Sequence, residues 1–405
     1  MAKKKKPESS FFDDLLKRAG VDIPTVSNAP QKPVTFYDTG SLILNALLSG
    51  SMLGGISNKI TVLAGEESTG KTFIALQIIR NFLDRYPTAN VIVFDSEDDP
   101  SKGLGPLVDR KIDPDRIRVT ATNTIQDFKV QVNRITNQYL AEPVEGRPPL
   151  LLCLDSLGNL ASTKEAKDTD EEKVNAKGEE IKDMSKPALL RGLFRVLSVK
   201  IGEAQIPMLI TNHTYESMDP YGTKRIMSGG GGAKYSSSSI VFLGKKKHYD
   251  TDKSVIGSIL TASLEKSRFT RQGKKAELLL AHDYGLDKYW GLFELGKELG
   301  LLPLVGKVYE FPDGQTASRK EIEATPAKYF DTKVNFDAFE ALCNKTFKFG
   351  NGETPPDEDE GEETEIVPAE PPSDYEGATA FAHWNEDSTE QVKKTLKKKQ
   401  ASKKK

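Results

Sequence analysis

Short apolar runs alternate with helical patterns from about residue 36 to residue 302. Between the first two runs, the apolar positions of residues 74–83 recur every three or four residues, which predicts an amphipathic helix. Short apolar strands separated by helices are typical of an α/β fold with a mostly parallel sheet covered on both faces. The later runs lie closer together, which predicts an antiparallel extension of that sheet. The strand candidates are residues 59–64, 91–94, 150–154, 208–211, 239–244 and 276–280.

The segments on either side of this core, residues 36–302, have different patterns. Residues 1–35 form a leader in which FFDDLLKRAG predicts one short amphipathic helix, and prolines after it interrupt regular structure. Residues 303–350 predict a small C-terminal subdomain, where VYEFPDGQTASRKE is typical of a hairpin with a Pro-Asp-Gly turn. Residues 351–405 are dominated by Pro, Glu and Lys, and we expect a disordered tail there, acidic first and then lysine-rich.

The charge of the chain is segregated along the sequence. The 405 residues include 57 Lys and Arg against 59 Asp and Glu, a formal net charge of −2. Seven of the nine residues 357–365 are acidic, whereas residues 393–405 include eight Lys. Because such blocks are usually solvated tails, the near-zero sum does not describe the core and does not exclude a nucleic-acid partner.

Cysteine usage and hydropathy indicate the compartment. The two cysteines, Cys153 and Cys343, are too few for a disulfide framework, and Cys153 lies within an apolar strand candidate. No run approaches the roughly 20 apolar residues of a membrane helix. The basic N-terminus lacks the apolar segment of a secretory signal. We therefore expect a soluble protein of a reducing, cytoplasmic compartment.

The strongest motif is GEESTGKT, which matches the phosphate-loop pattern G-x-x-x-x-G-K-[ST] at every fixed position. A strand candidate leads into it and a helical pattern follows it. Glycines let backbone amides close around phosphate oxygens, and the helix N-terminus adds partial positive charge. We expect Lys71 to reach the β- and γ-phosphates and the Thr72 hydroxyl to ligate Mg²⁺. The expected nucleotide-binding residues are Gly65, Glu66, Glu67, Ser68, Thr69, Gly70, Lys71 and Thr72.

An ATPase also needs a carboxylate at the magnesium. LLLCLDS supplies Asp155 at the end of an apolar strand candidate. Strand C-termini converge on the ligand in open α/β sheets, which favours a magnesium role, direct or through water, over an aspartate that only caps a turn. ATP and Mg²⁺ are therefore the expected substrate and cofactor.

Hydrolysis further requires a group that orients or deprotonates the attacking water. VIVFDSED ends a third strand candidate with four acids among residues 95–99, and Glu97 is the candidate, although spacing does not choose among the four. MLITNHTYE ends a fourth strand candidate with Asn212 and His213, polar groups placed to sense a γ-phosphate.

Six segments taken in order resemble the RecA family of DNA recombinases: GEESTGKT, VIVFDSE, LLLCLDSLGNLAS, ITNHTYE, MSGGGGAKYSSSS and LEKSR. They are most similar to the UvsX-type recombinases of tailed phages, over roughly residues 36–300. The resemblance implies a DNA-stimulated ATPase that forms helical filaments on single-stranded DNA and exchanges strands with homologous duplex DNA. It also implies a mediator and a single-strand-binding protein as partners, and a recombination, repair and replication context in the infected bacterial cytoplasm.

The resemblance assigns roles to individual residues. Glu97 matches the catalytic glutamate of the family, and His213 matches its polar switch residue after the fourth strand. Lys266 and Arg268 match basic residues that reach the ATP of the neighbouring subunit, which implies ATP between protomers. The leader, residues 1–35, is implied to dock on a neighbouring protomer during polymerisation, although an isolated amphipathic segment such as FFDDLL is also compatible with packing on its own domain.

The resemblance further implies two DNA-binding loops, at about residues 157–186 and 214–235. The mixed charges of the first loop also leave open a plain charged surface insertion. In the second, basic side chains can neutralise phosphates, and glycines let backbone amides approach the strand. Arg195 falls where the family has a phosphate-contacting arginine. The expected DNA-binding residues are Arg195, Lys224, Arg225, Gly229, Gly230, Gly231, Gly232 and Lys234.

Two other functions share this fold and stay open: a ring-forming helicase or other motor, and an ATP-binding scaffold without hydrolysis. The extended match around Asp155, His213 and Lys266 favours the recombinase. The sequence departs from the bacterial pattern after Glu97, where DDPSKGLGPLVDR contains no aromatic to stack on adenine. The adenine contact is therefore not identified by sequence.

Overall fold

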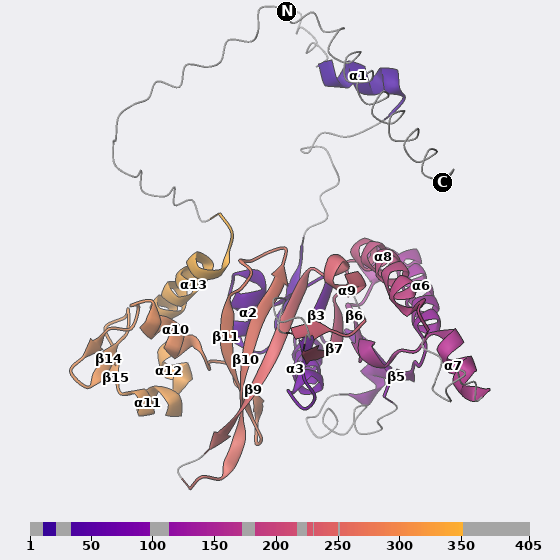
Figure 1. Cartoon of the computed structure of the whole chain (residues 1–405). Helices are drawn as coiled ribbons and strands as arrows, with labels where there is room; N and C mark the ends of the chain where they lie inside the picture. The colour runs from indigo at the N-terminus through magenta and orange to yellow at the C-terminus, as the bar shows by residue number, and fades with distance from the viewer. Residues whose placement is uncertain are drawn as a thin grey trace, which may run out of the picture. The chain divides into compact units, whose positions relative to one another are not determined.

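The computed structural model describes residues 11–21, 34–97, 113–171, 183–216, 225–229, 231–249 and 252–350 (Figure 1). The expected tail, residues 351–405, lies outside these ranges. The first described segment is the short helix α1 (Phe11–Ala19), which confirms the helix predicted in the leader.

The described core is built on a ten-stranded sheet of order β12-β11-β10-β9-β3-β7-β6-β4-β5, with β8 paired to β7. Its strands, in chain order, are β3 (Ile60–Gly65), β4 (Asn90–Asp95), β5 (Ile117–Ala121), β6 (Leu150–Asp155), β7 (Met208–Glu216), β8 (Arg225–Met227), β9 (Ser239–Tyr249), β10 (Val255–Ser267), β11 (Lys275–Ala281) and β12 (Gly285–Leu286). A separate two-stranded ribbon pairs β1 (Phe36–Tyr37) with β2 (Ile56–Ser57).

The predicted change from parallel to antiparallel pairing is confirmed. Strands β9, β3, β7, β6, β4 and β5 run parallel to their neighbours in that order. Strands β9, β10, β11 and β12 are antiparallel. All six residues of β3 and of β6 are buried. Burial on both faces explains why these strands are continuous apolar runs in the sequence.

Two apolar cores cover the two faces of the sheet. In β6, Leu151 and Cys153 belong to one core, whereas Leu152 and Leu154 belong to the other, because successive strand residues point to opposite faces. The first core includes α2 (Leu42–Ser49) and α3 (Lys71–Arg85). The second includes α6 (Ile125–Ala141) and α8 (Lys186–Ala204), which lie side by side (Figure 1). The helices are layered on both faces, as the apolar pattern predicts.

Four strands of this sheet escaped the search for apolar runs: the short strands β8 and β12, and the longer strands β5 and β10. The burial of β10 alternates over most of its length, and its sequence VIGSILTASLEKS mixes Ser and Thr with apolar residues. Strand β5 lies at the edge of the sheet, where only Ile117 of its five residues is buried. Both patterns arise because one face of the strand meets solvent or a neighbouring loop.

The C-terminal part of the core adds four helices and a small sheet to the first apolar core. The helices are α10 (Leu292–Glu298), α11 (Arg319–Ala324), α12 (Pro326–Phe330) and α13 (Lys333–Phe347), and the strands are β13 (Leu304–Val305), β14 (Val308–Glu310) and β15 (Thr316–Ala317). The predicted hairpin is confirmed: β14 pairs with β15, and the amide of Gly314 donates to the carbonyl of Phe311 across the Pro-Asp turn. Phe339 and Phe347 share a buried cluster with α2, and the Glu340 carboxylate accepts from the amide of Met52 at 2.7 Å.

The remaining described elements are the helices α7 (Thr163–Asp170) and α9 (Gly231–Ser236) and three short 3₁₀ helices, Pro114–Arg116, Val144–Gly146 and Leu157–Asn159. Within the described ranges, none of the helices is both long and apolar enough to span a membrane.

Candidate functional site

The turn from Gly65 to Thr72 joins β3 to α3 at the carboxyl end of the parallel strands. Gly70 has φ +86° and precedes the first helical residue, so the left-handed conformation that favours glycine occurs there. A Cβ on Gly65 would lie 2.6 Å from the Thr69 hydroxyl, which itself donates to the carbonyl of Glu66 at 2.8 Å. The two fixed glycines of the motif therefore have local steric causes.

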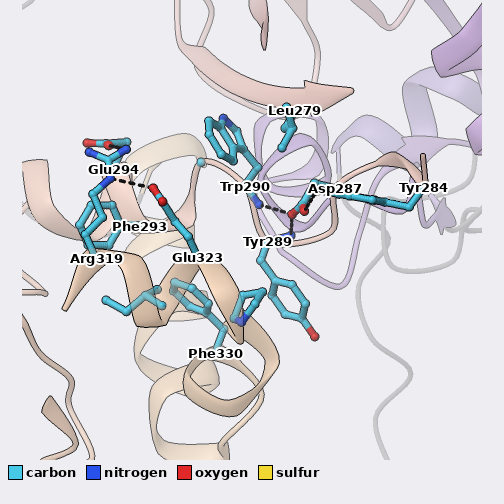
Figure 2. A pocket seen from close by; sticks show the side chains of 13 residues that line it. Leu279, Tyr284, Asp287, Tyr289, Trp290, Phe293, Glu294, Arg319, Glu323 and Phe330 are labelled. Atoms are coloured by element: carbon cyan, nitrogen blue, oxygen red, sulfur yellow. Dashed lines mark hydrogen bonds and ion pairs between the residues drawn. The ribbon is translucent and has the colours of Figure 1, made fainter. Parts of the chain in front are cut away.

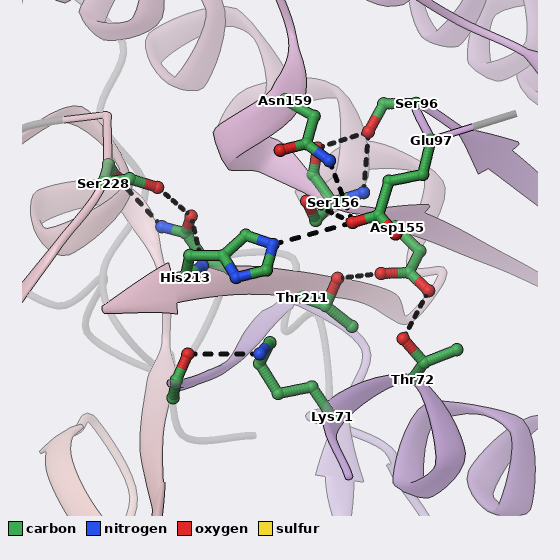
Figure 3. A network of polar contacts seen from close by, with 12 residues as sticks. Lys71, Thr72, Ser96, Glu97, Asp155, Ser156, Asn159, Thr211, His213 and Ser228 are labelled. Carbon is green, nitrogen blue, oxygen red and sulfur yellow. Dashed lines mark hydrogen bonds and ion pairs between the residues drawn. The ribbon is translucent and has the colours of Figure 1, made fainter. Parts of the chain in front are cut away.

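Lys71 is buried at the start of α3, and its amine closes the turn from inside. Its Nζ donates to the carbonyl of Gly65 at 3.1 Å and to the carbonyl of Glu66 at 2.7 Å (Figure 3). A buried ammonium held by carbonyl oxygens is a natural partner for an anion that brings stronger oxygen acceptors. The geometry is therefore suited to phosphate oxygens.

Asp155 connects this turn to two other strands. Its Oδ2 accepts from the hydroxyl of Thr72 at 2.8 Å, and its Oδ1 accepts from the hydroxyl of Thr211 on β7 (Figure 3). Thr211 is fully buried and Asp155 is 5% exposed. Mg²⁺ prefers oxygen ligands, commonly one or two carboxylates with substrate phosphates and waters, so a hydroxyl and a carboxylate in contact fit its chemistry. Among the described residues there is no group of three or more His, Cys, Asp or Glu suited to a metal.

Glu97 lies directly after β4, opposite the end of β6. Its Oε1 accepts from the amide of Asn159 at 2.9 Å and from the hydroxyl of Ser156 at 3.2 Å, and lies 3.6 Å from Nε2 of His213 (Figure 3). These contacts orient one oxygen of a carboxylate that is 29% exposed. The structure therefore brings Glu97 and His213 together, as expected for two residues of one site.

The other acids of the same segment differ from Glu97. Asp95 is buried in β4, and its Oδ1 accepts from the amide of Glu97 at 2.9 Å, so it shapes the backbone that presents Glu97. Asp98 and Asp99 lie outside the described residues.

The side chain of Asn212, in the middle of β7, contacts Ser228 in the segment after β8. Its Nδ2 donates to the carbonyl of Ser228 at 2.9 Å, and the Ser228 hydroxyl donates back to its Oδ1 at 2.6 Å. The amide of Ser228 also donates to the carbonyl of His213. The buried Asn212 side chain thus fixes β7 to the second expected DNA loop, a contact that its sequence position did not indicate.

Lys266 and Arg268 lie at the carboxyl end of β10, where both are held by α9 (Gly231–Ser236). The Lys266 amine donates to the carbonyls of Lys234 and Tyr235, and Arg268 Nη2 donates to the Tyr235 carbonyl at 3.4 Å. Partial burial, followed by the nearby charges of Arg268 and Lys234, lowers the pKa of Lys266. Two cations are therefore assembled next to each other at the end of this helix.

The described residues of the two expected DNA loops include helices and strands. The first includes α7 (Thr163–Asp170), which begins with a capping box between Ser162 and Glu165, and ends at the first residue of α8. The second includes the end of β7, all of β8 and most of α9. The described residues of both segments therefore include helix or strand, whereas residues 172–182, 217–224 and 230 lie outside the described ranges. Hydrogen bonds at the α7 cap and across the β7–β8 pair hold the described parts, and DNA binding by either segment stays a prediction.

The expected DNA-contacting side chains are partly engaged within the chain. Arg225 Nη2 lies 3.3 Å from Oε1 of Glu66, and Lys234 Nζ lies 3.4 Å from Oε1 of Glu265. Arg195 is exposed on α8. Lys224 and Gly230 lie outside the described residues.

The glycines of the second segment have packing roles. A Cβ on Gly232 would lie 3.0 Å from the backbone nitrogen of Arg191 on α8, and one on Gly229, where φ is +83°, would lie 3.1 Å from Leu190. Gly231 is exposed at the start of α9. Close packing of α9 against α8 thus accounts for Gly232 without any DNA, and the DNA contacts of these glycines stay a prediction.

A pocket lies between the β11–β12 edge of the sheet and the helices α10, α11 and α12 (Figure 2). Polar groups that line this pocket pair with one another: Asp287 accepts from the backbone amides of Tyr289 and Trp290, and Arg319 forms ion pairs with Glu294 and Glu323. None of the expected site residues lines this pocket. Its aromatic residues Phe293 and Phe330 belong to the first apolar core.

The sequence did not identify three residues that contact Asp155 or Glu97, namely Ser156, Asn159 and Thr211. Thr211 is a hydroxyl inside an apolar strand, two positions before His213, and that placement was a usable signal. Asn159 and Ser156 follow Asp155 within DSLGN, where spacing alone does not indicate that they face Glu97.

The chain is similar in sequence to a known phage protein. No protein-family model matches the chain. The chain is 30% identical over 262 residues to the recombination and repair protein of Enterobacteria phage T4. The aligned region covers 64% of this chain and 63% of that protein, so the chain spans less than two thirds of the length of this relative.

Proposed function

We propose that the chain is a recombination and repair protein of the RecA family, of the UvsX type found in tailed phages. In this proposal it binds ATP between protomers, assembles as a helical filament on single-stranded DNA, and exchanges strands with homologous duplex DNA while hydrolysing ATP. The observation that carries it is the convergence of Thr72, at the start of α3, with Asp155 at the end of β6 and Glu97 after the neighbouring parallel strand β4. The similarity to the T4 recombination and repair protein supports the same biological process.

The residues of the turn bind and orient the nucleotide. The Lys71 amine, now on the carbonyls of Gly65 and Glu66, exchanges these acceptors for phosphate oxygens of ATP. Thr72 and Asp155 are the residues that would hold Mg²⁺, and Thr211 fixes the second oxygen of the Asp155 carboxylate. Bound Mg²⁺ would neutralise charge on the phosphates.

Glu97 acts on the attacking water as the general base. Asn159 and Ser156 hold one carboxylate oxygen, which fixes the orientation of the Glu97 carboxylate. His213, at 3.6 Å from Glu97, responds to the γ-phosphate and passes its position to Ser228 through the backbone of β7. Lys266 and Arg268 supply positive charge to the ATP of the adjacent protomer.

Single-stranded DNA binds along the segments around α7 and β8–α9. Arg225 and Lys234, together with Arg195 and Lys224, supply the cations, and affinity should fall with salt as phosphates displace counterions. The leader helix α1 joins neighbouring protomers. Homologous duplex DNA is the second substrate, and a mediator and a single-strand-binding protein are proposed partners.

Electron microscopy with ATP, Mg²⁺ and single-stranded DNA, read together with ATP turnover, tests this proposal. Helical filaments with DNA-stimulated turnover are expected. Closed rings would replace it with a helicase, and nucleotide binding without turnover or assembly would replace it with a scaffold. The Lys71→Ala variant is the matched control, because it keeps the fold of α3 but lacks the phosphate-binding amine.

A further inference from the structure

The Gly65–Thr72 turn is held from outside by two cations that come from different strands. Arg225 on β8 pairs with the Glu66 carboxylate at 3.3 Å, and the Lys245 amine on β9 donates to the carbonyl of Ser68 at 3.0 Å. Glu66 and Ser68 belong to the exposed arc of the turn, whereas Lys71 closes it from inside. Two residues outside the GEESTGKT motif, Arg225 and Lys245, therefore contact the turn from its exposed side.

The guanidinium of Arg225 lies beside β9 where it reaches the turn. A Cβ on Gly244 would stand 4.0 Å from Nη1 of Arg225, so the guanidinium lies against the strand residue that precedes Lys245. In the β7–β8 ladder, Arg225 lies opposite Glu216, yet its ion pair is with Glu66. The direction of the side chain toward the turn is thus set by tertiary packing.

The Arg225 pair is exposed and easily exchanged. Its two side chains are 44% and 55% exposed, and exposed ion pairs of this kind contribute little to stability. The guanidinium is a strong bidentate partner for phosphate as well as for carboxylate, so a DNA phosphate competes directly with Glu66 for it.

We propose that Arg225 is a positioning residue shared between the nucleotide turn and the DNA strand: without DNA it holds Glu66, and a DNA phosphate withdraws it. This inference rests on the proposed function, because it takes strand binding at β8 as given. Release of Glu66 loosens one external hold on the turn, while Lys245 keeps the other. DNA occupancy is thereby communicated to the nucleotide turn by one side chain, in addition to the Asn212–Ser228 connection.

Fluorescence anisotropy with a labelled single-stranded oligonucleotide in the absence of nucleotide tests the competition. Glu66→Gln removes the intramolecular competitor and should tighten binding about two- to fivefold, the range set by an exposed ion pair. Glu67→Gln removes the same charge one residue along the turn and reports the general electrostatic effect, so the comparison is between these two variants. In the Arg225→Gln background, Glu66→Gln should bring no further gain over Glu67→Gln.

The outcomes separate this inference from the proposed function. Equal affinities of Glu66→Gln and Glu67→Gln, or a gain from Glu66→Gln that persists without Arg225, would overturn the shared role while strand binding itself remains. Failure of the wild-type chain to bind any single-stranded DNA, with or without ATP, would instead overturn the proposed function and the inference with it. The KM for ATP gives an independent readout: in wild type, DNA should change it, and in Arg225→Gln that DNA dependence should shrink at a matched degree of DNA saturation.

Discussion

Replacing Glu97 by Gln separates catalysis from structure. The amide oxygen of Gln can still accept from Asn159 and Ser156, which now donate to Oε1 at 2.9 and 3.2 Å. Two charge-assisted hydrogen bonds become neutral ones, and each change costs about 1 kcal/mol at most for a side chain that is partly exposed. The variant should therefore lose only about 1–2 kcal/mol of folding free energy.

The loss of catalysis should be much larger. An amide cannot take a proton from water, and a positioned general base contributes about 10²–10⁴-fold to rate. That factor corresponds to about 3–5 kcal/mol of activation free energy. Nucleotide binding should be retained, because the groups that bind phosphate and magnesium are unchanged. The variant is therefore expected to accumulate stable ATP-bound filaments.

The measurements are DNA-stimulated ATP turnover, binding of a fluorescent nucleotide and urea unfolding. A matched control is Glu97→Ala, which leaves the Asn159 amide and the Ser156 hydroxyl without their acceptor and should lose more stability for a similar loss of rate. Normal turnover in Glu97→Gln would refute the assignment of a general base. A loss of nucleotide binding as large as the loss of turnover would show that Glu97 acts on the structure of the site.

Three further predictions concern the nucleotide turn, the Asp155 carboxylate and the hydrogen bond between Ser162 and Asp183. Lys71→Ala should lower ATP affinity and abolish DNA-stimulated turnover, and undiminished turnover in a phosphate-release assay would contradict the site. Thr211→Val removes the buried hydroxyl that donates to Asp155, so unfolding in denaturant should show a loss of about 1–3 kcal/mol and turnover should need more Mg²⁺; an unchanged Mg²⁺ requirement would separate Thr211 from the metal. The hydroxyl of Ser162, followed by the backbone amide and hydroxyl of Ser185, lowers the pKa of Asp183 to about 2, so its stabilisation is present above its ordinary value of 3.8 and is lost as pH falls toward 2. Ser162→Ala should raise that pKa toward 3.8 in a ¹³C NMR titration, and an unshifted titration would show that this hydrogen bond is not formed in solution.

Much of the fold could be predicted because its central strands are buried on both faces. Residues 150–154 form such an apolar run, and the structure has β6 there. The same criterion fails for β10 and β5, whose partly exposed faces carry polar residues. Helix α7 was missed although the spacing of Ser162 and Glu165 is that of a capping box, a signal that was present in the sequence.

The sequence by itself determined the local chemistry of the Gly65–Thr72 turn. Its glycines, its buried lysine and the helix that follows are consecutive residues, so their geometry depends mainly on local sterics and hydrogen bonds. The sequence also indicated that Asp155, Glu97 and His213 end strands, and parallel strands bring such ends to one edge of a sheet.

Only the tertiary structure decided which of these side chains meet. Thr211 reaches Asp155 because β7 lies between β3 and β6, and strand order is set by packing of distant segments. Arg225 contacts Glu66, and not its cross-strand neighbour Glu216, because the assembled sheet brings β8 and β9 next to the Gly65–Thr72 turn. The apolar pattern specifies that a strand is buried but not its neighbour, so contacts between residues far apart in the chain follow from the assembled sheet alone.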